Sequence, residues 1–392
     1  MSLSATERAV LDKIDEAALV ALTRSLVQAV GQNPPGEEAA TVAVLEAAAV
    51  ELGLDVAVMP VRPGRDNLRI TLAGGAGRGL LLLGHTDVVP IGEGWTRDPF
   101  GGAVENGRIY GRGASDMKGG LAAALSAMAA LRGAGLTGPV ELAALVDEEE
   151  NGAGIRAYVE SAPTELVGCI TAEPTDLQTI VGARGAAYLR VEIHGTACHA
   201  GDPDLGANAI YGAAAVVAEI ERMHRELAQR PHPLLGPATW SVGQIYGGSS
   251  GSIVPADCVV VADRRLLPGE SIATVLAGVR DRVAGLGLTD RGLTVDITMP
   301  MEMPAFETST ECPLASTVDT VLADAGGPGL MPGGWTAACD GGFVARDLGV
   351  PVVVLGPGSV ATQAHRPDES VGIDELVVAA RAYALSALRL LG

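Results

Sequence analysis

The sequence contains few cysteines, and their arrangement suits neither disulfides nor a thiolate metal site. There are five in 392 residues, an odd number, widely spaced and without a C-x-x-C pair. This argues against a disulfide framework and against zinc held by sulfur. We therefore expect a reducing compartment, the cytoplasm.

Long apolar runs and an excess of basic residues are also missing. No run approaches the roughly 18 apolar residues of a membrane span, and the N-terminal segment is acidic where a signal peptide would be basic. Lys and Arg number 27 against 47 Asp and Glu, a formal net charge of −20. Such a charge repels phosphate backbones and anionic lipids, so we expect neither nucleic acid nor a membrane as a partner.

The length and the apolar pattern predict two domains. A chain of 392 residues exceeds the roughly 250 to 300 at which one core stops growing. Short apolar runs typical of strands buried on both faces occupy residues 80–83, 140–146, 167–172 and 351–355. An Ala-rich helical segment at 120–131 lies between them, and another at 19–30 precedes the first strand. This alternation predicts an α/β domain with a mostly parallel sheet.

The middle of the chain has a different order of elements. Strands are expected at 187–193, 239–245, 258–266 and 293–298, and helices at 207–227 and 272–286. The order β-α-β-β-α-β is that of a ferredoxin-like α+β domain. We therefore expect this domain to be inserted at 184–299, with 1–183 and 300–392 forming the discontinuous α/β domain.

Polar residues follow each apolar strand of the α/β domain. They are His85 with Asp87, the acidic run Asp147 to Glu150, Glu173, and His365 after the loop GPGS. Ligands of open α/β sheets bind beyond the carboxyl ends of the strands, so we expect these side chains at one edge. Asp116, within GRGASDMKGG, is either the N-cap of the following helix or a group that approaches an ion.

Two imidazoles and several carboxylates are a donor set that suits Zn²⁺. A carboxylate that bridges suits a pair of ions roughly 3.5 to 4 Å apart, as in two-metal hydrolases. Two cations would also offset the mutual repulsion of so many buried carboxylates. We therefore expect two Zn²⁺ ions per subunit, with Co²⁺ or Mn²⁺ as alternatives.

The motifs GHTDVVP, GRGASDMKGG, AEPT and AHRPDES resemble those of the zinc-dependent aminoacylase and carboxypeptidase metallohydrolases. This family includes acetylornithine deacetylase, succinyl-diaminopimelate desuccinylase and glutamate carboxypeptidase. The motifs span most of the chain. The resemblance implies that the α/β domain is a zinc-hydrolase catalytic domain, that the insertion is a lid and dimerisation domain, and that the protein is a homodimer.

The resemblance also implies the metal ligands. His85, Asp116 and Glu173 would hold one zinc ion. Asp116 would bridge to a second ion held by Glu149 and His365. The family has a cis peptide bond after its bridging Asp, so one is expected between Asp116 and Met117.

The resemblance further implies catalytic groups beside the metals. Glu148 would be the general base, which takes a proton from the attacking water and returns it to the leaving amine. Asp87 would fix the tautomer and orientation of the His85 ring.

Other residues implied by the resemblance bind substrate. His199, in HGTACHAG, would stabilise the oxyanion in a neighbouring subunit's active site; the less favoured alternative is a lid-loop residue without that role. Arg265 would bind a substrate carboxylate, or else pair with Asp263 on the surface. Ser252 stands where the family commonly has Asn, and Gly358 of GPGS is a further substrate-binding position.

The motifs are nearest to the deacetylase and desuccinylase branch, so we expect removal of an N-acyl group from an amino acid. A metallo-exopeptidase, either a carboxypeptidase or a dipeptidase, is the main alternative. A silent binding relative would be expected to lack a ligand or the base, and a carbamoyl hydrolase would differ at Glu173. The acyl group, the amino acid, its stereochemistry and the native metal stay open.

Overall fold

Residues 3–161 and 165–392 are described by a computed structural model. Internal contacts divide the chain into two units. Unit 1 comprises Met1–Gly182, Glu307–Gly334 and Cys339–Gly392, and unit 2 comprises Ala183–Phe306 and Trp335–Ala338. Unit 2 runs beyond residue 299, the end expected from the sequence, because its last strand continues to Met303. Among the described helices, none combines the length and hydropathy needed to cross a membrane.

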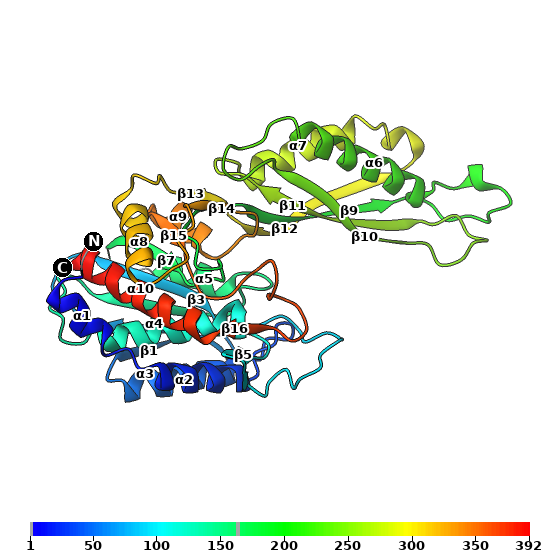
Figure 1. Cartoon of the computed structure of the whole chain (residues 1–392). Helices are drawn as coiled ribbons and strands as arrows, with labels where there is room; N and C mark the ends of the chain where they lie inside the picture. Colours follow the sequence, from blue (N-terminus) through cyan, green and yellow to red (C-terminus); the bar gives the residue numbers. More distant parts are fainter. Residues whose placement is uncertain (1–2, 162–164) are drawn as a thin grey trace. The chain divides into compact units, whose positions relative to one another are not determined.

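Unit 1 is built on a nine-stranded sheet (Figure 1). In spatial order its strands are β1 (Asp55–Arg62), β2 (Arg65–Leu72), β6 (Val140–Leu145), β3 (Gly79–His85), β7 (Leu166–Thr171), β15 (Val352–Val354), β8 (Ile180–Ala183) and β13 (Phe306–Glu307), and β14 (Gly333–Trp335) pairs with β8. The four central strands are those expected from the apolar runs. They run parallel, whereas β1, β2 and β8 pair antiparallel, so the sheet is mixed.

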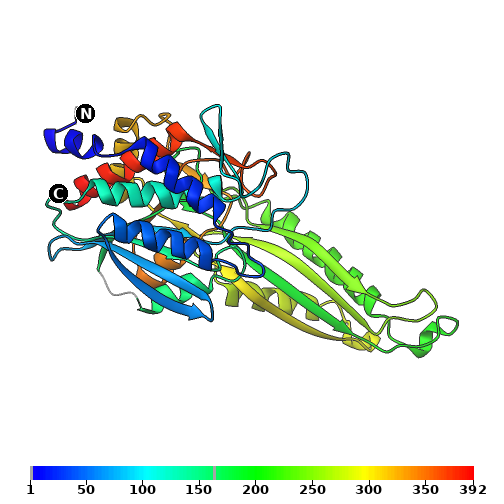
Figure 2. The ribbon, with the colours of Figure 1, turned by 90° about the horizontal axis from the view of Figure 1, so that it is seen from below.

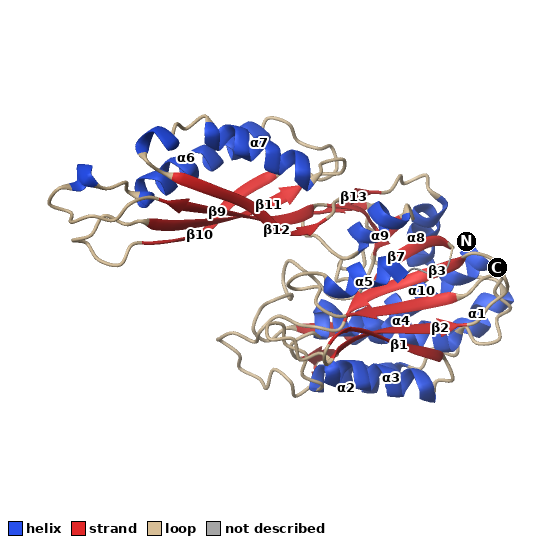
Figure 3. Cartoon of the chain, turned by 180° about the vertical axis from the view of Figure 1, so that it is seen from behind, coloured by secondary structure: helices blue, strands red, loops and turns tan. Residues whose placement is uncertain are grey.

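Helices cover both faces of this sheet (Figures 1 and 3). On one face lie α2 (Glu16–Gln28), α3 (Ala39–Glu51), α4 (Gly119–Ala130), α8 (Pro313–Asp324) and α10 (Ile373–Leu391). On the other lie α5 (Ala153–Ser161) and α9 (Gly341–Leu348), which contact each other. Helix α4 is apolar around its whole circumference, and it is accordingly buried between α10 and the sheet. The predicted α/β class is confirmed.

The two ends of the chain meet in unit 1 (Figure 2). Helix α1 (Ala5–Leu11) contacts α10, and Arg389 forms an ion pair of 2.7 Å with Glu7. A small sheet, β16 (Ser370–Gly372), β5 (Arg108–Tyr110) and β4 (Ala103–Glu105), joins the C-terminal segment to the chain just before Asp116.

Unit 2 is an antiparallel sheet with two helices on one face (Figure 3). Its elements in chain order are β9 (Gly185–His194), α6 (Ala209–Leu227), β10 (Thr239–Gly247), β11 (Asp257–Leu266), α7 (Ile272–Ala284) and β12 (Thr294–Met303). The strand order β10-β11-β9-β12 is that of a ferredoxin-like sheet. Alternate residues of the strands, such as Val191 and Val260, form the core with Val216 of α6. The predicted inserted α+β fold is confirmed.

Candidate metal centre

The predicted metal ligands converge at the carboxyl ends of the central strands. His85 is the last residue of β3, Glu149 follows β6, and Glu173 follows β7. Asp116 lies in the kinked turn Ala114–Lys118, directly before α4, and His365 lies in the loop before β16. The parallel order of the strands brings these residues together, because the carboxyl ends of β6, β3 and β7 lie at the same edge.

Asp116 faces both imidazoles, one with each carboxylate oxygen. Its Oδ1 lies 3.2 Å from Nε2 of His85, and its Oδ2 lies 3.4 Å from Nε2 of His365. It is not the N-cap of α4, a position that Lys118 occupies, and its own backbone angles are not helical. The bond between Asp116 and Met117 is a cis peptide, as expected.

Each imidazole also faces a second carboxylate. Nε2 of His85 lies 3.6 Å from Oε1 of Glu173, and Nε2 of His365 lies 3.3 Å from Oε2 of Glu149. The donors therefore fall into two sets, one around each imidazole, that share Asp116. The two sets adjoin, because ligand atoms of His85, Asp116 and Glu149 lie within 4.8 Å of one another. This arrangement and this chemistry fit two divalent cations.

The centre is closed on one side and open on the other. The side chain of His85 is 1% exposed, whereas that of His365 is 54% exposed. The exposed side of the centre is therefore the side at His365.

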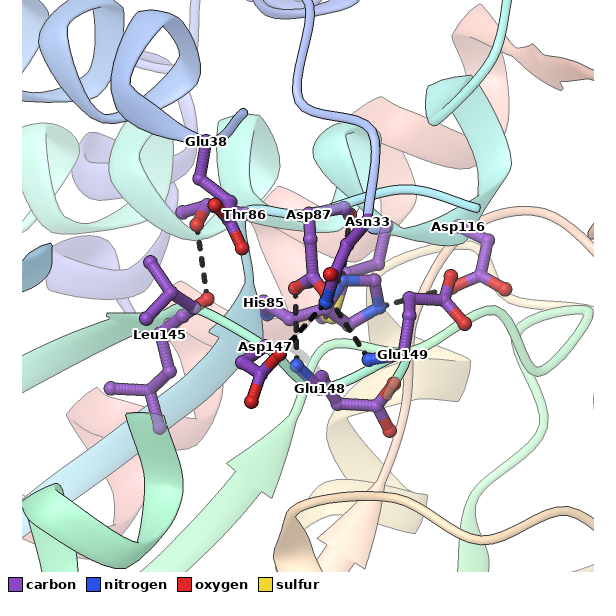
Figure 4. A network of polar contacts seen from close by, with 12 residues as sticks. Asn33, Glu38, His85, Thr86, Asp87, Asp116, Leu145, Asp147, Glu148 and Glu149 are labelled. Carbon is purple, nitrogen blue, oxygen red and sulfur yellow. Dashed lines mark hydrogen bonds and ion pairs between the residues drawn. The ribbon is translucent and has the colours of Figure 1, made fainter. Parts of the chain in front are cut away.

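Asp87 is tied to both halves of the centre (Figure 4). Nδ1 of His85 lies 2.9 Å from the main-chain carbonyl oxygen of Asp87 and 3.6 Å from its carboxylate. The carboxylate accepts the main-chain N–H groups of Glu148, at 3.2 Å, and Glu149, at 3.1 Å. The nearest acceptor to the imidazole is thus the carbonyl, while the carboxylate anchors the acidic loop.

Glu148 is a buried carboxyl group among other carboxylates. Its pKa is raised well above the ordinary value by burial and by the charges of Glu173 and Glu149, although His85 opposes this. Burial likewise raises the pKa values of Glu149 and Glu173. Such crowding stabilises the protonated form, and bound cations would reverse it.

The pKa values of Asp116 and of the two imidazoles shift so that the charged form of each group is favoured. Burial alone would raise the pKa of Asp116, but hydrogen bonds to His365 and His85 hold that pKa well below its ordinary value. Contacts with Asp116 and Glu149 raise the pKa of His365 to about 10. The pKa of His85 is also raised, because Glu173 and Asp116 outweigh the effect of burial.

We expect metal binding to release protons and to strengthen as the pH rises. The pKa of His365 is raised to about 10, so its ring carries a proton at pH 8 in the metal-free protein, whereas a ligating imidazole must be neutral. The raised pKa values of His85, Glu149 and Glu173 favour their protonated forms in the same way. Binding at that pH should therefore release protons, at least the one on His365. Titration with Zn²⁺ by calorimetry, in two buffers of different ionisation enthalpy, measures this number. Binding without proton release would contradict the proposed ligands.

A buried ion pair supports Asp116 from behind. Oε1 of Glu369 accepts the main-chain N–H groups of Ser115, at 2.9 Å, and Asp116, at 3.0 Å. Its Oε2 lies 2.6 Å from Nη1 of Arg112, whose guanidinium lies over the ring of Trp95. Glu369 is part of AHRPDES, but local spacing carries no sign of this contact with a residue so distant in the chain.

Only part of the acidic run faces the centre. Glu148 and Glu149 do so, whereas Glu150 is exposed. Asp147, which has a positive φ of 69°, is buried and accepts a hydrogen bond of 3.0 Å from Asn33. Sequence reasoning did not identify Asn33, whose own motif, NPPGEE, carries no chemical signal of a metal site.

A further carboxyl group lies behind the acidic loop. Asp340, directly before α9, is buried, and neither of its oxygens accepts a hydrogen bond from a described residue. Burial raises its pKa to about 8. It lies in the segment ACDGGF, in which the sequence analysis found no candidate.

Gly358 packs against the turn that carries Asp116. It has a positive φ of 86°, and a Cβ atom there would lie 2.2 Å from Oγ of Ser115. Ser115 also accepts a hydrogen bond of 3.1 Å from the main chain of Ser359. Glycine is required here by close packing, and its predicted contact with substrate stays a prediction.

The remaining predicted residues lie in unit 2. His199 and Ser252 come from adjacent loops, since Ala200 donates a 3.0 Å hydrogen bond to the carbonyl of Ser252. His199 is exposed, and its Nδ1 accepts from the main chain of Gly201. Arg265 lies on β11, and its Nε is 3.0 Å from Oδ1 of Asp263, which is the surface pairing weighed as an alternative.

Three solved structures are similar to the chain over nearly its full length. A metallo-carboxypeptidase of the M20 family from Sulfolobus solfataricus is 20% identical, with a TM-score of 0.80 over 95% of this chain and 99% of that one. A tripeptidase from Staphylococcus aureus is 22% identical, with a TM-score of 0.77 over 97% and 99%. A dipeptidase from Saccharomyces cerevisiae is 14% identical, with a TM-score of 0.78 over 99% of both. At these identities the likeness shows the shared fold.

A family model supplies the stronger evidence. Residues 81–389 match the model of Peptidase family M20/M25/M40, and this range includes all the predicted metal ligands. The match agrees with the resemblance found in the sequence motifs. The chain therefore belongs to peptidase family M20/M25/M40, whose members are metal-dependent hydrolases of amide bonds.

Proposed function

We propose that this protein is a two-metal amidohydrolase that removes an N-acyl group from an amino acid. The observation that carries the proposal is the placement of Asp116, whose two carboxylate oxygens face different imidazoles. A carboxylate between two donor sets is the arrangement that two adjacent metal ions require. His85 and Glu173 would complete one set, and His365 and Glu149 the other.

Glu148 is the proposed general base. When bound, the two cations would lower the pKa of a water molecule and polarise the amide carbonyl. Glu148 is buried beside both donor sets, close enough for His85, Glu173 and Glu149 to affect its charge. It would take a proton from the attacking water and return it to the leaving amine. Asp87 would fix the positions of the His85 ring and of the loop that carries Glu148, through the contacts described above.

An exopeptidase on the same scaffold is the second candidate. A carboxypeptidase, a tripeptidase and a dipeptidase are among the similar structures, but identities of 22% or less support the fold and not the substrate. Both reactions cleave an amide bond with the same machinery. The deacylase is favoured because the motifs around His85, Asp116, Glu173 and His365 are nearest to that branch.

The roles of the unit 2 residues and the homodimer stay proposals. We propose that His199 stabilises the oxyanion and that Arg265 and Ser252 bind substrate. Unit 2 exposes several large apolar side chains, Leu205, Ile210, Tyr211, Ile245, Tyr246 and Ile253. Such residues suit a protein interface, which supports a homodimer through this unit. The mass of the protein in solution would test it, and a monomer at all concentrations would overturn it.

We expect the purified protein to release amine from acylated amino acids, and to stop when a chelator is added. The test is a panel of N-acetyl, N-succinyl and longer N-acyl amino acids beside dipeptides and tripeptides, assayed for free α-amino groups. Activity should return when Zn²⁺, Co²⁺ or Mn²⁺ is restored, because the five ligands remain in place. The metal that restores the highest kcat also identifies the best cofactor.

The outcomes separate the candidates. Release from acylated amino acids supports the deacylase and names its acyl group. Release from peptides alone would move the protein to the exopeptidases. Activity that a chelator leaves unchanged would contradict the two-metal proposal.

A further inference from the structure

A chain of buried polar contacts leads from the acidic loop to the start of α3. The amide nitrogen Nδ2 of Asn33 donates to Asp87, at 2.9 Å, and to Asp147, at 3.0 Å (Figure 4). Nη2 of Arg65 lies 3.0 Å from the same oxygen of Asp147. The guanidinium of Arg65 also contacts both carboxylate oxygens of Glu38. Arg65 thus joins Glu38 to the loop that precedes the proposed base.

Among these contacts, Arg65 is the residue that is hardest to replace, because it supplies the positive charge. Glu38, Asp87 and Asp147 are all fully buried, and the side chain of Arg65 is 11% exposed. Three buried carboxylates without a cation would repel one another and would lack partners for their oxygens. The guanidinium of Arg65 contacts Glu38 and Asp147. The neutral amide of Asn33 donates a hydrogen bond to Asp87.

The segment NPPGEE is shaped around this arginine. It supplies Asn33 and Glu38, and between them Gly36 has a positive φ of 98°. A Cβ atom on Gly36 would lie 2.6 Å from Cζ of Arg65. The glycine therefore leaves room for the guanidinium. The same short segment supplies Asn33, which contacts the acidic loop, and Glu38, which contacts Arg65.

The acidic loop depends on these contacts for its conformation. Asp147 has a positive φ of 69°, a backbone conformation that is uncommon for residues other than glycine, although Asp adopts it more readily than most. Its Oδ2 accepts the main-chain N–H of Ala153, at 3.2 Å, and its carbonyl oxygen accepts that of Gly152, at 2.6 Å. Arg65 holds the other carboxylate oxygen. The direction in which the next residue, Glu148, leaves this turn is therefore set by how Asp147 is held.

We infer that Arg65 is a positioning residue for catalysis, which fixes Asp147 and thereby the placement of Glu148 and Glu149. It does not touch the reacting atoms. Loss of its contacts would displace the proposed base and one ligand of the ion at His365, while the set formed by His85 and Glu173 stays in place. This inference rests on the proposed function, because it assigns those two residues their roles.

The test compares Arg65→Lys with Arg62→Lys. Lysine keeps the charge but cannot serve Glu38 and Asp147 from one planar group. We expect kcat to fall about 10- to 100-fold in Arg65→Lys, the range typical of residues that support metal ligands, with KM changed by less than about threefold. Arg62 is the matched control, since it is half exposed and 4.0 Å from the other oxygen of Asp147. Its variant should behave as the wild type.

Two readouts do not depend on turnover. Calorimetric titration of the metal-free proteins with Zn²⁺ should show weaker binding of one ion, by about 10- to 100-fold, and an unchanged second ion. Hydrogen exchange of the metal-free protein should be faster in residues 147–153 of Arg65→Lys, because the N–H groups of Glu148 and Glu149 bond to Asp87. The same segment should exchange at the wild-type rate in Arg62→Lys.

A purely structural role predicts a different result. It would lower the melting temperature and the yield while leaving kcat per folded, metal-loaded molecule unchanged, and that result would overturn the inference. If Arg65→Lys does not fold, Glu38→Gln replaces it, since it loosens the guanidinium from one side. Both kcat and the affinity for the ion at His365 should then fall about 10-fold, the low end of the range for residues that support metal ligands. An unchanged kcat in Glu38→Gln would overturn the inference.

Wild-type behaviour separates this inference from the proposed function. A wild-type protein that binds no divalent cation and cleaves no amide would overturn the proposed function, and this inference with it. A wild type that does both, beside an Arg65→Lys protein with the same kcat, metal affinities and exchange, would overturn the inference alone.

Discussion

Replacing Glu148 by glutamine should abolish most turnover while leaving both metals bound. The substitution keeps the size of the side chain but removes the group that exchanges a proton with water and with the leaving amine. A general base contributes about 10²- to 10⁴-fold to the rate, so we expect kcat to fall by that factor. KM and metal content should change little, because Glu148 is not among the five proposed ligands. Steady-state kinetics and metal analysis of the same preparation measure both.

The matched control for this prediction is Glu150→Gln. It makes the same chemical change two positions along the same loop, at an exposed side chain. Its kcat and metal content should equal those of the wild type. A fully active Glu148→Gln protein would contradict the assignment of Glu148 as the base. Loss of metal in that variant would instead indicate that Glu148 is a metal ligand.

Replacing Asp116 by asparagine should loosen both ions together. Each of its oxygens faces a different imidazole, at 3.2 and 3.4 Å, so one substitution removes a negative charge from both donor sets. Two unit charges about 4 Å apart interact by about 4 kcal/mol at an effective dielectric constant near 20, and a divalent ion doubles this energy. Loss of even half of that energy is roughly a thousandfold in affinity. Titration of the metal-free variant with Zn²⁺ measures the two affinities, and amide hydrolysis should be lost at micromolar metal.

Two further variants show whether Asp116 bridges. Glu173→Gln should weaken one ion and Glu149→Gln the other, because each carboxylate faces only one imidazole. The turn itself should persist in Asp116→Asn, because the main-chain N–H of residue 116 still donates to Glu369. If Asp116→Asn weakened a single ion, the carboxylate would not be shared and the two-metal centre would need another bridge.

The location of the centre could be predicted from the sequence because the signals are local. Continuous apolar runs indicated the central strands, and a polar residue directly after each run indicated one edge of the sheet. His85, the acidic run Asp147 to Glu150, Glu173 and His365 follow from that reasoning once the strands are parallel, whereas the choice of Glu149 within the run came from the family resemblance. The inserted unit was also predictable, since its strands and helices alternate in the ferredoxin-like order.

The supporting contacts could not be read in the same way. Asn33 and Asp147 are 114 positions apart, and Asp116 and Glu369 are 253 apart. No periodicity or spacing connects such pairs, and Arg65 or Glu369 in isolation is an ordinary charged residue. The antiparallel ribbon formed by β1 and β2, which carries Arg65, was not among the predicted strands, although β1 contains the apolar segment VAVMPV.

The sequence by itself determined which residue types reach the edge of the sheet, because the order of apolar and polar residues along each strand decides what its end presents. Only the tertiary structure decided which of these side chains face the proposed centre and which pair with other residues. In the acidic run, Asp147 contacts Arg65, Glu148 and Glu149 face the proposed metal centre, and Glu150 faces solvent. The physical reason is that buried charges are stable only beside partners, and those partners come from segments that folding alone brings together.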